Sequence, residues 1–451
     1  MQKYLKILGK RILSEANDLK RTPKALALET GVPLKTILSI IDGSASEEKA
    51  HDLISIMVQI YPISPSRLLV EKDDTNCGVL IMRDGDSKNS SRIFDRPNAS
   101  GKLMPYYEYR DTAMSRAGPY KPEWIRPLRA DNASDPYSAD IAYNNGHLMH
   151  QLTFFIGQIN FYWELNGDKY CREMNTGSSN YITPFVKHSF ASKYPENSGF
   201  IIAVTYGDQV HQALEEFSHI ASRDTDTLAG NLRNSVEALH AKINRQLESE
   251  SLSSNQLIDR LTLQGIKRTR AQQLILDARF PTIDELGILA QALYVKPSDL
   301  MVIELTSEEE LVLQNADEGI SRSYPDTKRP TCMLTELVRS QHQPNLKGFN
   351  VSLIEGTTQF KHSLHEFIYN YGSAPVTLSW STDKQDVINS GDSAYIRPMV
   401  KHALTKLSDS DKANLLLVRT PGKLTDSVLS EYSTYPSSQR YRVNGEDVVW
   451  F

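Results

Sequence analysis

The sequence predicts an α+β protein with two tandem repeats, each a helical unit followed by a β-barrel. The first observation is a duplication, because YITPFVKHSF at 181–190 returns as YIRPMVKHAL at 395–404, 214 residues later. The second is a change in residue pattern that occurs twice along the chain, from apolar residues at helical spacing to runs of aromatic and β-branched residues. A constant offset with the same element order indicates one unit of about 215 residues that was duplicated.

Residues 1–75 are expected to form a helix-turn-helix-like helical domain. The stretch PKALALETGVPLKTILSIIDG (23–43) has small and apolar residues where two crossing helices would meet. Gly31 lies at the predicted turn, and Gly43 ends the second helix because glycine adopts the left-handed conformation of a helix end.

Residues 101–222 are expected to form the first barrel. LTFFIGQINFYWELNGDKY (152–170) is aromatic and β-branched, and Asn166-Gly167 within it is a typical hairpin turn. The runs GSSNYITPFVKHSF and GFIIAVTYG predict two further strands.

The second half repeats this order. Residues 228–305 are expected to form a second, degenerate helical domain, in which KPSDLMV (296–302) matches SPSRLLV (64–70) of the first. Residues 330–420 are expected to form the second barrel.

Three segments lie outside these predicted domains. The polar segments 76–100 and 306–330 are expected to be linkers. The C-terminal tail, 421–451, has no predicted structure.

Composition restricts the classes of function. A formal charge of −5 is unusual for a dedicated nucleic-acid binder, so no nucleic-acid partner is expected. Cys77, Cys171 and Cys332 show no CxxC spacing, which argues against a zinc ribbon or a disulfide scaffold and fits the reducing cytoplasm. No apolar run reaches membrane-spanning length, so no membrane association is expected.

Histidines and one amide predict a metal site in the first barrel. NNGHLMHQL (144–152) contains His147 and Gln151, and His188 follows His147 by 37 residues. Two histidines and one oxygen ligand can bind one face of a divalent metal and leave the other open for substrate and dioxygen. Strand alternation points His150 to the opposite face. Because four residues of straight strand span about 13 Å, the chain must bend near Gly146–His150 for both ligands to reach one metal.

The second barrel repeats the pattern with a carboxylate. His362, Glu366 and His402 stand 214 or 215 residues after their counterparts, so both sets are candidate metal ligands. We favour the first set because Asn144-x-Gly146-His147 is intact there, whereas the second set lacks that asparagine and glycine.

The Gly-x6-Pro-x3-His segments that end at His188 and His402, together with the His-x-x-x-Gln and His-x-x-x-Glu segments, resemble the metal-binding segments of cupin barrels. A helix-turn-helix fused to a cupin resembles hydroxypropylphosphonate epoxidase. Two such units in one chain resemble hydroxyethylphosphonate dioxygenase and methylphosphonate synthase. The resemblance covers nearly the whole chain, apart from the tail after residue 420.

Two positions separate these relatives. The dioxygenase takes a carboxylate ligand six residues before the final histidine, where this chain has Ile182; the synthase uses a glutamine four residues after the first histidine, here Gln151. The resemblance to methylphosphonate synthase implies Fe(II) and O2 and the conversion of 2-hydroxyethylphosphonate to methylphosphonate plus CO2 or bicarbonate, without external reductant. Dioxygenase chemistry, which gives hydroxymethylphosphonate and formate, is the alternative.

The resemblance also implies residues that bind a phosphonate substrate. Asn144 matches the asparagine before the first histidine ligand, and Tyr107 and Tyr109 in MPYYEYR match a tyrosine pair that contacts substrate. Asn144 and Tyr109 are expected to be catalytic as well as substrate-binding.

A lysine from the helical unit reaches into a barrel in this family. Counting back from Gly31 favours Lys20, expected to be both catalytic and substrate-binding, with Lys24 as second choice. Arg96 and Lys102 are weaker candidates to bind the phosphonate.

Other classes of function remain. A helix-turn-helix joined to a cupin also describes transcription regulators, but PLKTILSII (33–41) has only one basic residue, Lys35, for phosphate contacts. An oxygenase or isomerase with another small substrate is a further alternative. We expect a homo-oligomer.

Overall fold

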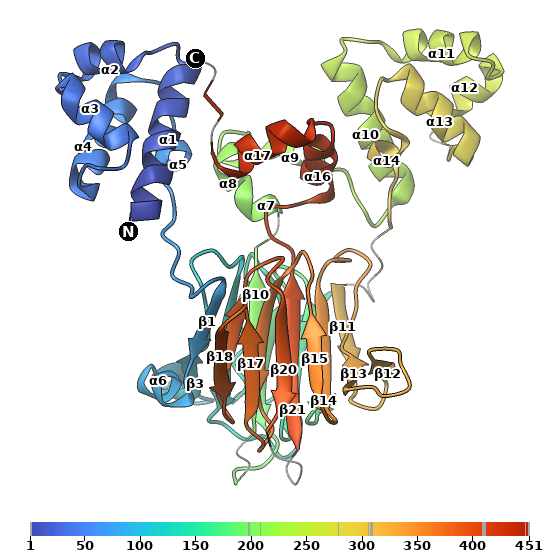
Figure 1. Ribbon diagram of the computed structural model, residues 1–451. Helices are drawn as coiled ribbons and strands as arrows, with labels where there is room; N and C mark the ends of the chain where they lie inside the picture. The colour runs from blue at the N-terminus through green and yellow to red at the C-terminus, as the bar shows by residue number, and fades with distance from the viewer. Residues whose placement is uncertain are drawn as a thin grey trace.

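The chain forms a stack of β-sheets with helical units on one side of it (Figure 1). This computed structural model describes residues 2–449 except 197–198, 208, 278, 305, 307–309, 408–411 and 447. The predicted ends of the second helical domain (305) and of the tail (450–451) therefore lie outside the described residues. Every helix in the described part is too short or too polar to cross a bilayer.

The N-terminal helical unit contains five helices around a core that includes Leu8, Ile12 and Ile37. They are α1 (Gln2–Asp18), α2 (Pro23–Thr30), α3 (Leu34–Ile41), α4 (Glu47–Ile60) and α5 (Pro65–Leu68). Thr22 caps α2 by accepting from the backbone N–H of Ala25. The turn predicted at Gly31 is confirmed, since its φ is 72°.

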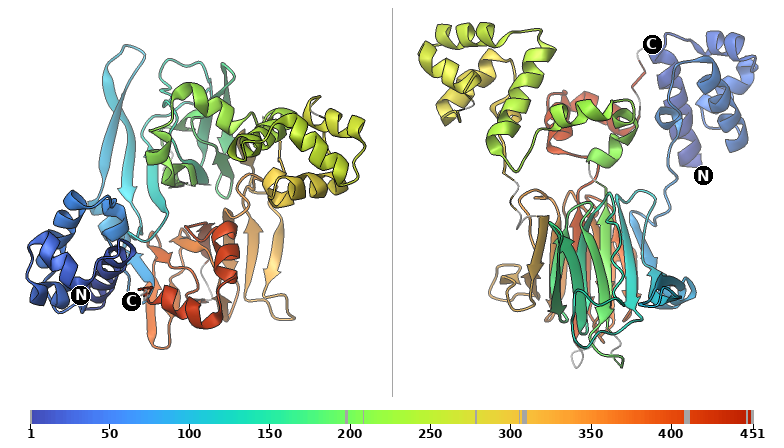
Figure 2. Two further views of the ribbon diagram at one scale, coloured as in Figure 1. Left: turned by 90° about the horizontal axis from the view of Figure 1, so that it is seen from above. Right: turned by 180° about the vertical axis from the view of Figure 1, so that it is seen from behind.

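Helices in the second half form another unit on the same side of the stack, at the opposite end from the N-terminal unit (Figure 2). They are α10 (Ser235–Ser249), α11 (Ser254–Leu263), α12 (Arg268–Ile275), α13 (Ile283–Ala292) and α14 (Pro297–Leu300). They pack around a core that includes Leu257, Leu274 and Leu289.

Short helices lie between the two units (Figure 2). They are α7 (Gln209–Gln212), α8 (Leu214–Phe217), α9 (Ser222–Ala229), α16 (Asp426–Ser433) and α17 (Ser437–Asn444). The last strand before them ends at Tyr206, so the expected first barrel stops short of residue 222. The tail is folded, and Glu446 pairs with Arg11 of α1.

Two seven-stranded sheets form the middle of the stack. The first has the order β11-β8-β5-β10-β4-β3-β2 and the second β1-β19-β16-β21-β14-β13-β12. The strands of the first are β2 (Arg92–Pro97), β3 (Leu103–Asp111), β4 (Tyr120–Pro127), β5 (His150–Ile156), β8 (Ser179–Ile182), β10 (Phe200–Tyr206) and β11 (Leu311–Gln314). Those of the second are β1 (Val79–Met82), β12 (Ser321–Tyr324), β13 (Cys332–Glu336), β14 (Lys347–Leu353), β16 (His365–Asn370), β19 (Ser393–Ile396) and β21 (Ala413–Thr420).

Each large sheet is covered by a small one. Over the first lies β7-β6-β9, with β6 (Ile159–Leu165), β7 (Asp168–Met174) and β9 (Lys187–Ser192). Over the second lies β15-β20-β17-β18, with β15 (Thr357–Phe360), β17 (Val376–Trp380), β18 (Lys384–Ile388) and β20 (His402–Lys406).

Side-chain alternation gives each large sheet two buried faces. On β5, Phe155 packs with Phe161 and Phe190 inside the first cupin-like barrel. The adjacent Phe154 joins a core with residues of the second large sheet, among them Phe367. The two large sheets therefore pack back to back, and the barrels share an apolar interface.

The prediction that 76–100 and 306–330 are linkers is wrong. β1 pairs with β19 of the second large sheet, and β11 pairs with β8 of the first, so each barrel receives an edge strand from the other half of the chain. The first segment also forms α6 (Asp84–Asn89) and β2. Short apolar runs such as VLIM (79–82) become strands because a distant edge offers them hydrogen bonds.

Candidate metal centre

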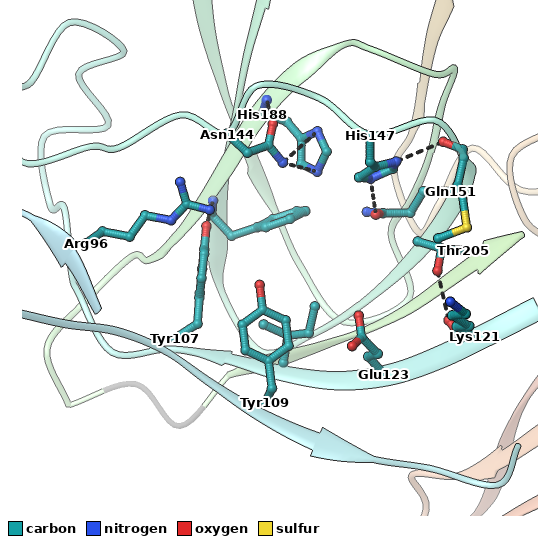
Figure 3. Close-up of a pocket in the computed structure, with 13 residues that line it drawn as sticks. Arg96, Tyr107, Tyr109, Lys121, Glu123, Asn144, His147, Gln151, His188 and Thr205 are labelled. Atoms are coloured by element: carbon teal, nitrogen blue, oxygen red, sulfur yellow. Dashed lines mark hydrogen bonds between the residues drawn. The ribbon is translucent and has the colours of Figure 1, made fainter. Parts of the chain in front are cut away.

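A cavity of about 230 Å³ opens inside the first barrel (Figure 3). Strands β2, β3, β4, β5, β9 and β10 and the loop before β5 all contribute to its wall. The lining residues are Arg96, Tyr107, Tyr109, Lys121, Glu123, Ile125, Asn144, His147, Met149, Gln151, His188, Phe190 and Thr205.

The loop before β5 has the bend that the ligand spacing requires. His147 lies ahead of the strand, which begins at His150, and Gly146 has a φ of 74°. A Cβ on Gly146 would come within 2.5 Å of Phe185 Cα. Only glycine fits this close approach, which lets the His147 side chain turn back toward Gln151.

His147 and Gln151 face each other with lone pairs. His147 Nδ1 donates to the Met149 carbonyl oxygen at 2.9 Å, so Nε2 carries the lone pair. The Gln151 amide nitrogen donates to Thr153 Oγ1 at 2.8 Å, which turns Gln151 Oε1 toward His147 Nε2 at 3.2 Å. When the imidazole is neutral, His147 Nε2 and Gln151 Oε1 both present lone pairs to the space between them, which is the arrangement that a cation stabilises.

His188 completes the set from β9. Its Nδ1 donates to the Val186 carbonyl oxygen at 2.9 Å, which leaves Nε2 as an acceptor. Burial lowers the pKa of His188 to about 4, so the imidazole is neutral at physiological pH. The His147 and His188 ring centroids lie 5.3 Å apart.

Asn144 connects the loop to β9. Its Oδ1 accepts from the backbone N–H of His188 at 2.9 Å and from that of Gly146 at 3.0 Å. Its Nδ2 lies 3.1 Å from His188 Nε2, at the edge of the cavity. Asn144 therefore both positions the ligands and presents an amide donor beside the metal position.

These three ligands fit a divalent metal. They offer two neutral imidazole nitrogens and one amide oxygen, all directed at one side of the cavity (Figure 3). Ile182 lies opposite Gln151 in the β5–β8 pair and is fully buried, so it contributes no ligand. No ligand in the set is anionic, and a bound Fe(II) would keep its full charge for an anionic substrate.

The predicted tyrosines differ in their surroundings. Tyr107 Oη accepts from the backbone N–H of Phe190 at 2.8 Å and lies 3.1 Å from Ser189 Oγ, so it ties β3 to β9. Burial raises the pKa of Tyr109 to about 12, which keeps its hydroxyl protonated as a donor. Arg96 reaches the same cavity from β2, and its Nε is a buried atom for which the described residues offer no hydrogen-bond partner.

Lys121, Glu123 and Thr205 line the cavity but were not predicted from the sequence. Gln151, Thr205 and Lys121 are neighbours across β5, β10 and β4, so they form one row. Burial raises the pKa of Glu123 above its usual range. The signal was period-two alternation at Lys121, Glu123 and Ile125 in YKPEWIRP (120–127).

The structure does not bring Lys20, Lys24 or Lys102 to this cavity. Lys20 follows α1 and Lys24 lies in α2, and both are exposed on the N-terminal helical unit. Lys102 is exposed in the turn before β3. Neither helical lysine lines the cavity of the first barrel in this chain, because the count from Gly31 fixes a position within the helical unit and not the packing of that unit against a barrel.

The second set of candidate ligands already contains a cation. Glu366 Oε2 lies 3.0 Å from His362 Nε2, and Oε1 lies 2.8 Å from His402 Nε2. Arg419 Nε donates to Glu366 Oε2. Burial would raise the pKa of Glu366, but the Arg419 charge and the two histidines hold it well below its usual range.

Comparison with known proteins gives relatives over the full length. No family model matches the chain. It is 34% identical over 457 residues to the methylphosphonate synthase of Nitrosopumilus maritimus (strain SCM1), covering 99% of this chain and 96% of that protein.

Solved structures agree in fold. The 2-hydroxyethylphosphonate dioxygenase of Streptomyces albus, with 2-hydroxyethylphosphonate and Fe(II) bound, superposes with a TM-score of 0.87 at 30% identity, covering 100% of this chain and 99% of that chain. Another 2-hydroxyethylphosphonate dioxygenase gives a TM-score of 0.76 at 16% identity, covering 96% and 99%, which is a likeness of fold alone.

Proposed function

The chain belongs to the methylphosphonate synthase family and is an iron-dependent oxygenase, and we propose on this premise that it cleaves the C–C bond of 2-hydroxyethylphosphonate. The products are methylphosphonate and CO2 or bicarbonate. The cofactor is Fe(II), O2 is the co-substrate, and no external reductant takes part.

One observation carries the assignment of product. Gln151 is the polar side chain at the third ligand position, and Ile182 opposite it cannot coordinate. The sequence resemblance associates this combination with the synthase and a carboxylate at position 182 with the dioxygenase. The amide is held in place by Thr153, so it acts as a fixed oxygen ligand.

Different cavity residues bind the metal and the phosphonate group of the substrate. His147, Gln151 and His188 would hold Fe(II), which would supply open positions for the substrate and dioxygen. Asn144 Nδ2 and the Tyr109 hydroxyl donate to phosphonate oxygens. Arg96 offsets part of the phosphonate charge with its guanidinium.

The other residues shape the space around the reacting carbon. Ile125, Met149 and Phe190 form an apolar wall that limits water near the C–C bond. Tyr107 holds β3 against β9 and thereby positions Tyr109 relative to His188. Lys121 and Glu123 line the cavity from β4, where burial raises the pKa of Glu123.

The reaction balances without a reductant. One 2-hydroxyethylphosphonate and one O2 give one methylphosphonate, one bicarbonate and one proton. The C–C bond breaks, the carbinol carbon is oxidised to bicarbonate, and the phosphonate-bearing carbon gains a hydrogen. All electrons for the reduction of O2 come from the substrate.

Phosphorus NMR tests this proposal. The protein is loaded with Fe(II) without oxygen, mixed with 2-hydroxyethylphosphonate, and exposed to air with no added reductant. We expect a methylphosphonate signal that Gln151→Ala and His188→Ala each reduce at least a hundredfold, because each variant removes a ligand of the metal. The matched control is Gln158→Ala, outside the cavity. A hydroxymethylphosphonate signal would assign dioxygenase chemistry instead, and no turnover would contradict the substrate.

The finer organisation is also proposed. We propose that the chain is a tandem duplication, with helical domains at 1–75 and 228–305, barrels built mainly from 101–206 and 330–420 and a tail at 421–451. Matched offsets of the two ligand sets support the duplication. We propose a homo-oligomer that binds no nucleic acid, in the cytoplasm, and three free cysteines support a reducing compartment.

A further inference from the structure

A second and larger cavity, of about 810 Å³, lies at the large sheet of the second barrel. Four cationic side chains line it: Arg322 of β12, Arg339, Lys347 of β14 and Arg419 of β21. It shares no lining residue with the metal centre. The cationic cluster is therefore a feature separate from the proposed active site.

The cluster carries more positive than negative charge. Arg322 pairs with Glu336, and Arg339 Nε lies 3.7 Å from the same carboxylate. Arg419 pairs with Glu366, behind the wall. Within this cluster, two carboxylates face four cations, so two positive charges remain uncompensated.

Partial burial makes the two uncompensated positive charges energetically unfavourable. Burial lowers the pKa of Arg339; Glu336 opposes this shift, and the neighbouring Arg322 and Arg419 add to it. Burial and Arg339 lower the pKa of Lys347 in the same way. Cations that depress one another's pKa repel, and a bound anion removes that repulsion.

Three of the guanidinium groups are held against one aromatic ring, and Arg322 Cζ lies 5.4 Å from the centroid of Phe349. Arg339 Cζ lies 4.9 Å and Arg419 Cζ lies 5.3 Å from the centroid of Phe349. Arg419 uses Nε for Glu366, so its two Nη groups serve as donors at the cavity wall. Contact with Phe349 restricts all three guanidinium groups before any ligand arrives, which reduces the entropy lost on binding.

We propose that this cavity binds a small dianionic oxoanion of the phosphate or phosphonate class. Guanidinium forks and an ammonium group are the donors that such oxygens prefer, and two uncompensated charges match a dianion. The same excess argues against a second metal at His362, Glu366 and His402, since Arg419 already neutralises the carboxylate and repels a divalent cation.

The position of the cavity supports a ligand site. Lys347 stands opposite Arg419 in the β14–β21 pair, as Lys121 stands opposite Thr205 in the β4–β10 pair. The cationic cavity thus corresponds in place to the metal cavity, with an arginine where the metal cavity has a threonine. The second barrel keeps the space for an anion and replaces the metal's charge with Arg419.

Calorimetric titration of the full-length, metal-free protein with inorganic phosphate at low ionic strength tests the proposal. We expect one phosphate bound per chain, sulfate bound with similar affinity, and acetate at least tenfold weaker because it carries one charge. Asn144→Ala protein should bind phosphate normally, since Asn144 belongs to the other cavity. No binding at millimolar phosphate, or acetate as tight as sulfate, would overturn the proposal.

Variants locate the site. Arg339→Gln with Lys347→Gln should weaken phosphate at least tenfold, whereas the charge-matched pair Lys267→Gln with Arg268→Gln on the second helical unit should change nothing. Glu336→Gln should tighten phosphate severalfold, a gain that misfolding cannot imitate. Equal phosphate affinity in the Arg339/Lys347 variant and the wild type would contradict the proposed site. Titration with methylphosphonate in place of phosphate shows whether the site prefers a phosphonate or a phosphate.

Discussion

At the scale of single residues, the metal centre depends on hydrogen bonds that choose which imidazole nitrogen keeps its proton. Carbonyl oxygens of Met149 and Val186 each accept from a histidine Nδ1, which leaves both Nε2 lone pairs for a metal. Thr153 Oγ1 accepts a hydrogen bond from the amide nitrogen of Gln151, which leaves the amide oxygen of Gln151 directed toward the metal position. The ligand set is therefore oriented before any metal binds.

Gly146→Ala tests this orientation. The new Cβ would meet the backbone of Phe185 at 2.5 Å, and the φ of 74° would itself be strained. We expect Fe(II) occupancy to fall at least tenfold in metal analysis of the purified protein, because the loop can no longer aim His147.

The matched control for this prediction is Gly167→Ala. Gly167 also has a positive φ, of 89°, but a Cβ there meets nothing within 4 Å. It should lose stability of about 1 kcal/mol and keep its iron. Equal iron loss in both variants would mean that backbone strain alone, rather than the Phe185 contact, determines occupancy.

At the scale of elements, hydrogen-bonded helix ends fix the second helical unit. Thr282 and Glu285 form a capping box at the start of α13. Arg270 of α12 donates to both oxygens of Glu285, at 2.8 and 2.7 Å. One carboxylate therefore caps a helix and joins it to its neighbour.

Glu285→Gln should loosen α12 and α13 in a pH-dependent way. The bond to Arg270 lowers the pKa of Glu285 from 4.5 to about 2. The stability that this carboxylate adds is therefore present above pH 4.5 and is lost as the pH falls toward 2. At pH 7 we expect a loss of about 1 kcal/mol, since solvent screens a pair near the surface.

Hydrogen–deuterium exchange in the full chain measures that loss. Peptides from α12 and α13 should exchange faster in the variant at pH 7, and the difference from wild type should shrink at pH 3. Asp259→Asn, which removes an exposed pair with Arg268, should have no measurable effect. A difference between variant and wild type that stays constant with pH would contradict a role for the Glu285 charge.

At the scale of the whole molecule, the two barrels depend on each other. β1 and β11 are each donated to the other barrel, and an apolar core that includes Phe154, Phe367 and Leu416 lies between the large sheets. Neither half can bury that core alone.

Separate expression of the halves tests this dependence. Residues 1–304 lack β11 and expose the face that the second large sheet covers, so we expect them to aggregate, and we expect the same of residues 306–451. Co-expression should recover a soluble complex in size-exclusion chromatography. A monomeric, soluble N-terminal half that binds iron would contradict the dependence.

Local patterns in the sequence determined much of this protein. The helix turn at Gly31 and the strands with alternating apolar residues follow from spacing, because a period of two or 3.6 states which side chains share a face. Spacing also made His147, Gln151 and His188 candidate ligands, and the family resemblance favoured them over the second set. The need for a bend before β5 also follows from strand geometry, and Gly146 meets it.

Tertiary structure decided what depends on residues far apart in the chain. Segments 79–82 and 311–314 become strands only because an edge more than a hundred residues away pairs with them. Lys20 lies outside the metal cavity. Arg419, 53 residues from Glu366 in the chain, forms an ion pair with that carboxylate, so Glu366 is less suited to bind a metal with His362 and His402. A sequence pattern ranks residues by type and spacing, but the charge and space around each side chain arise only when the sheets close on one another.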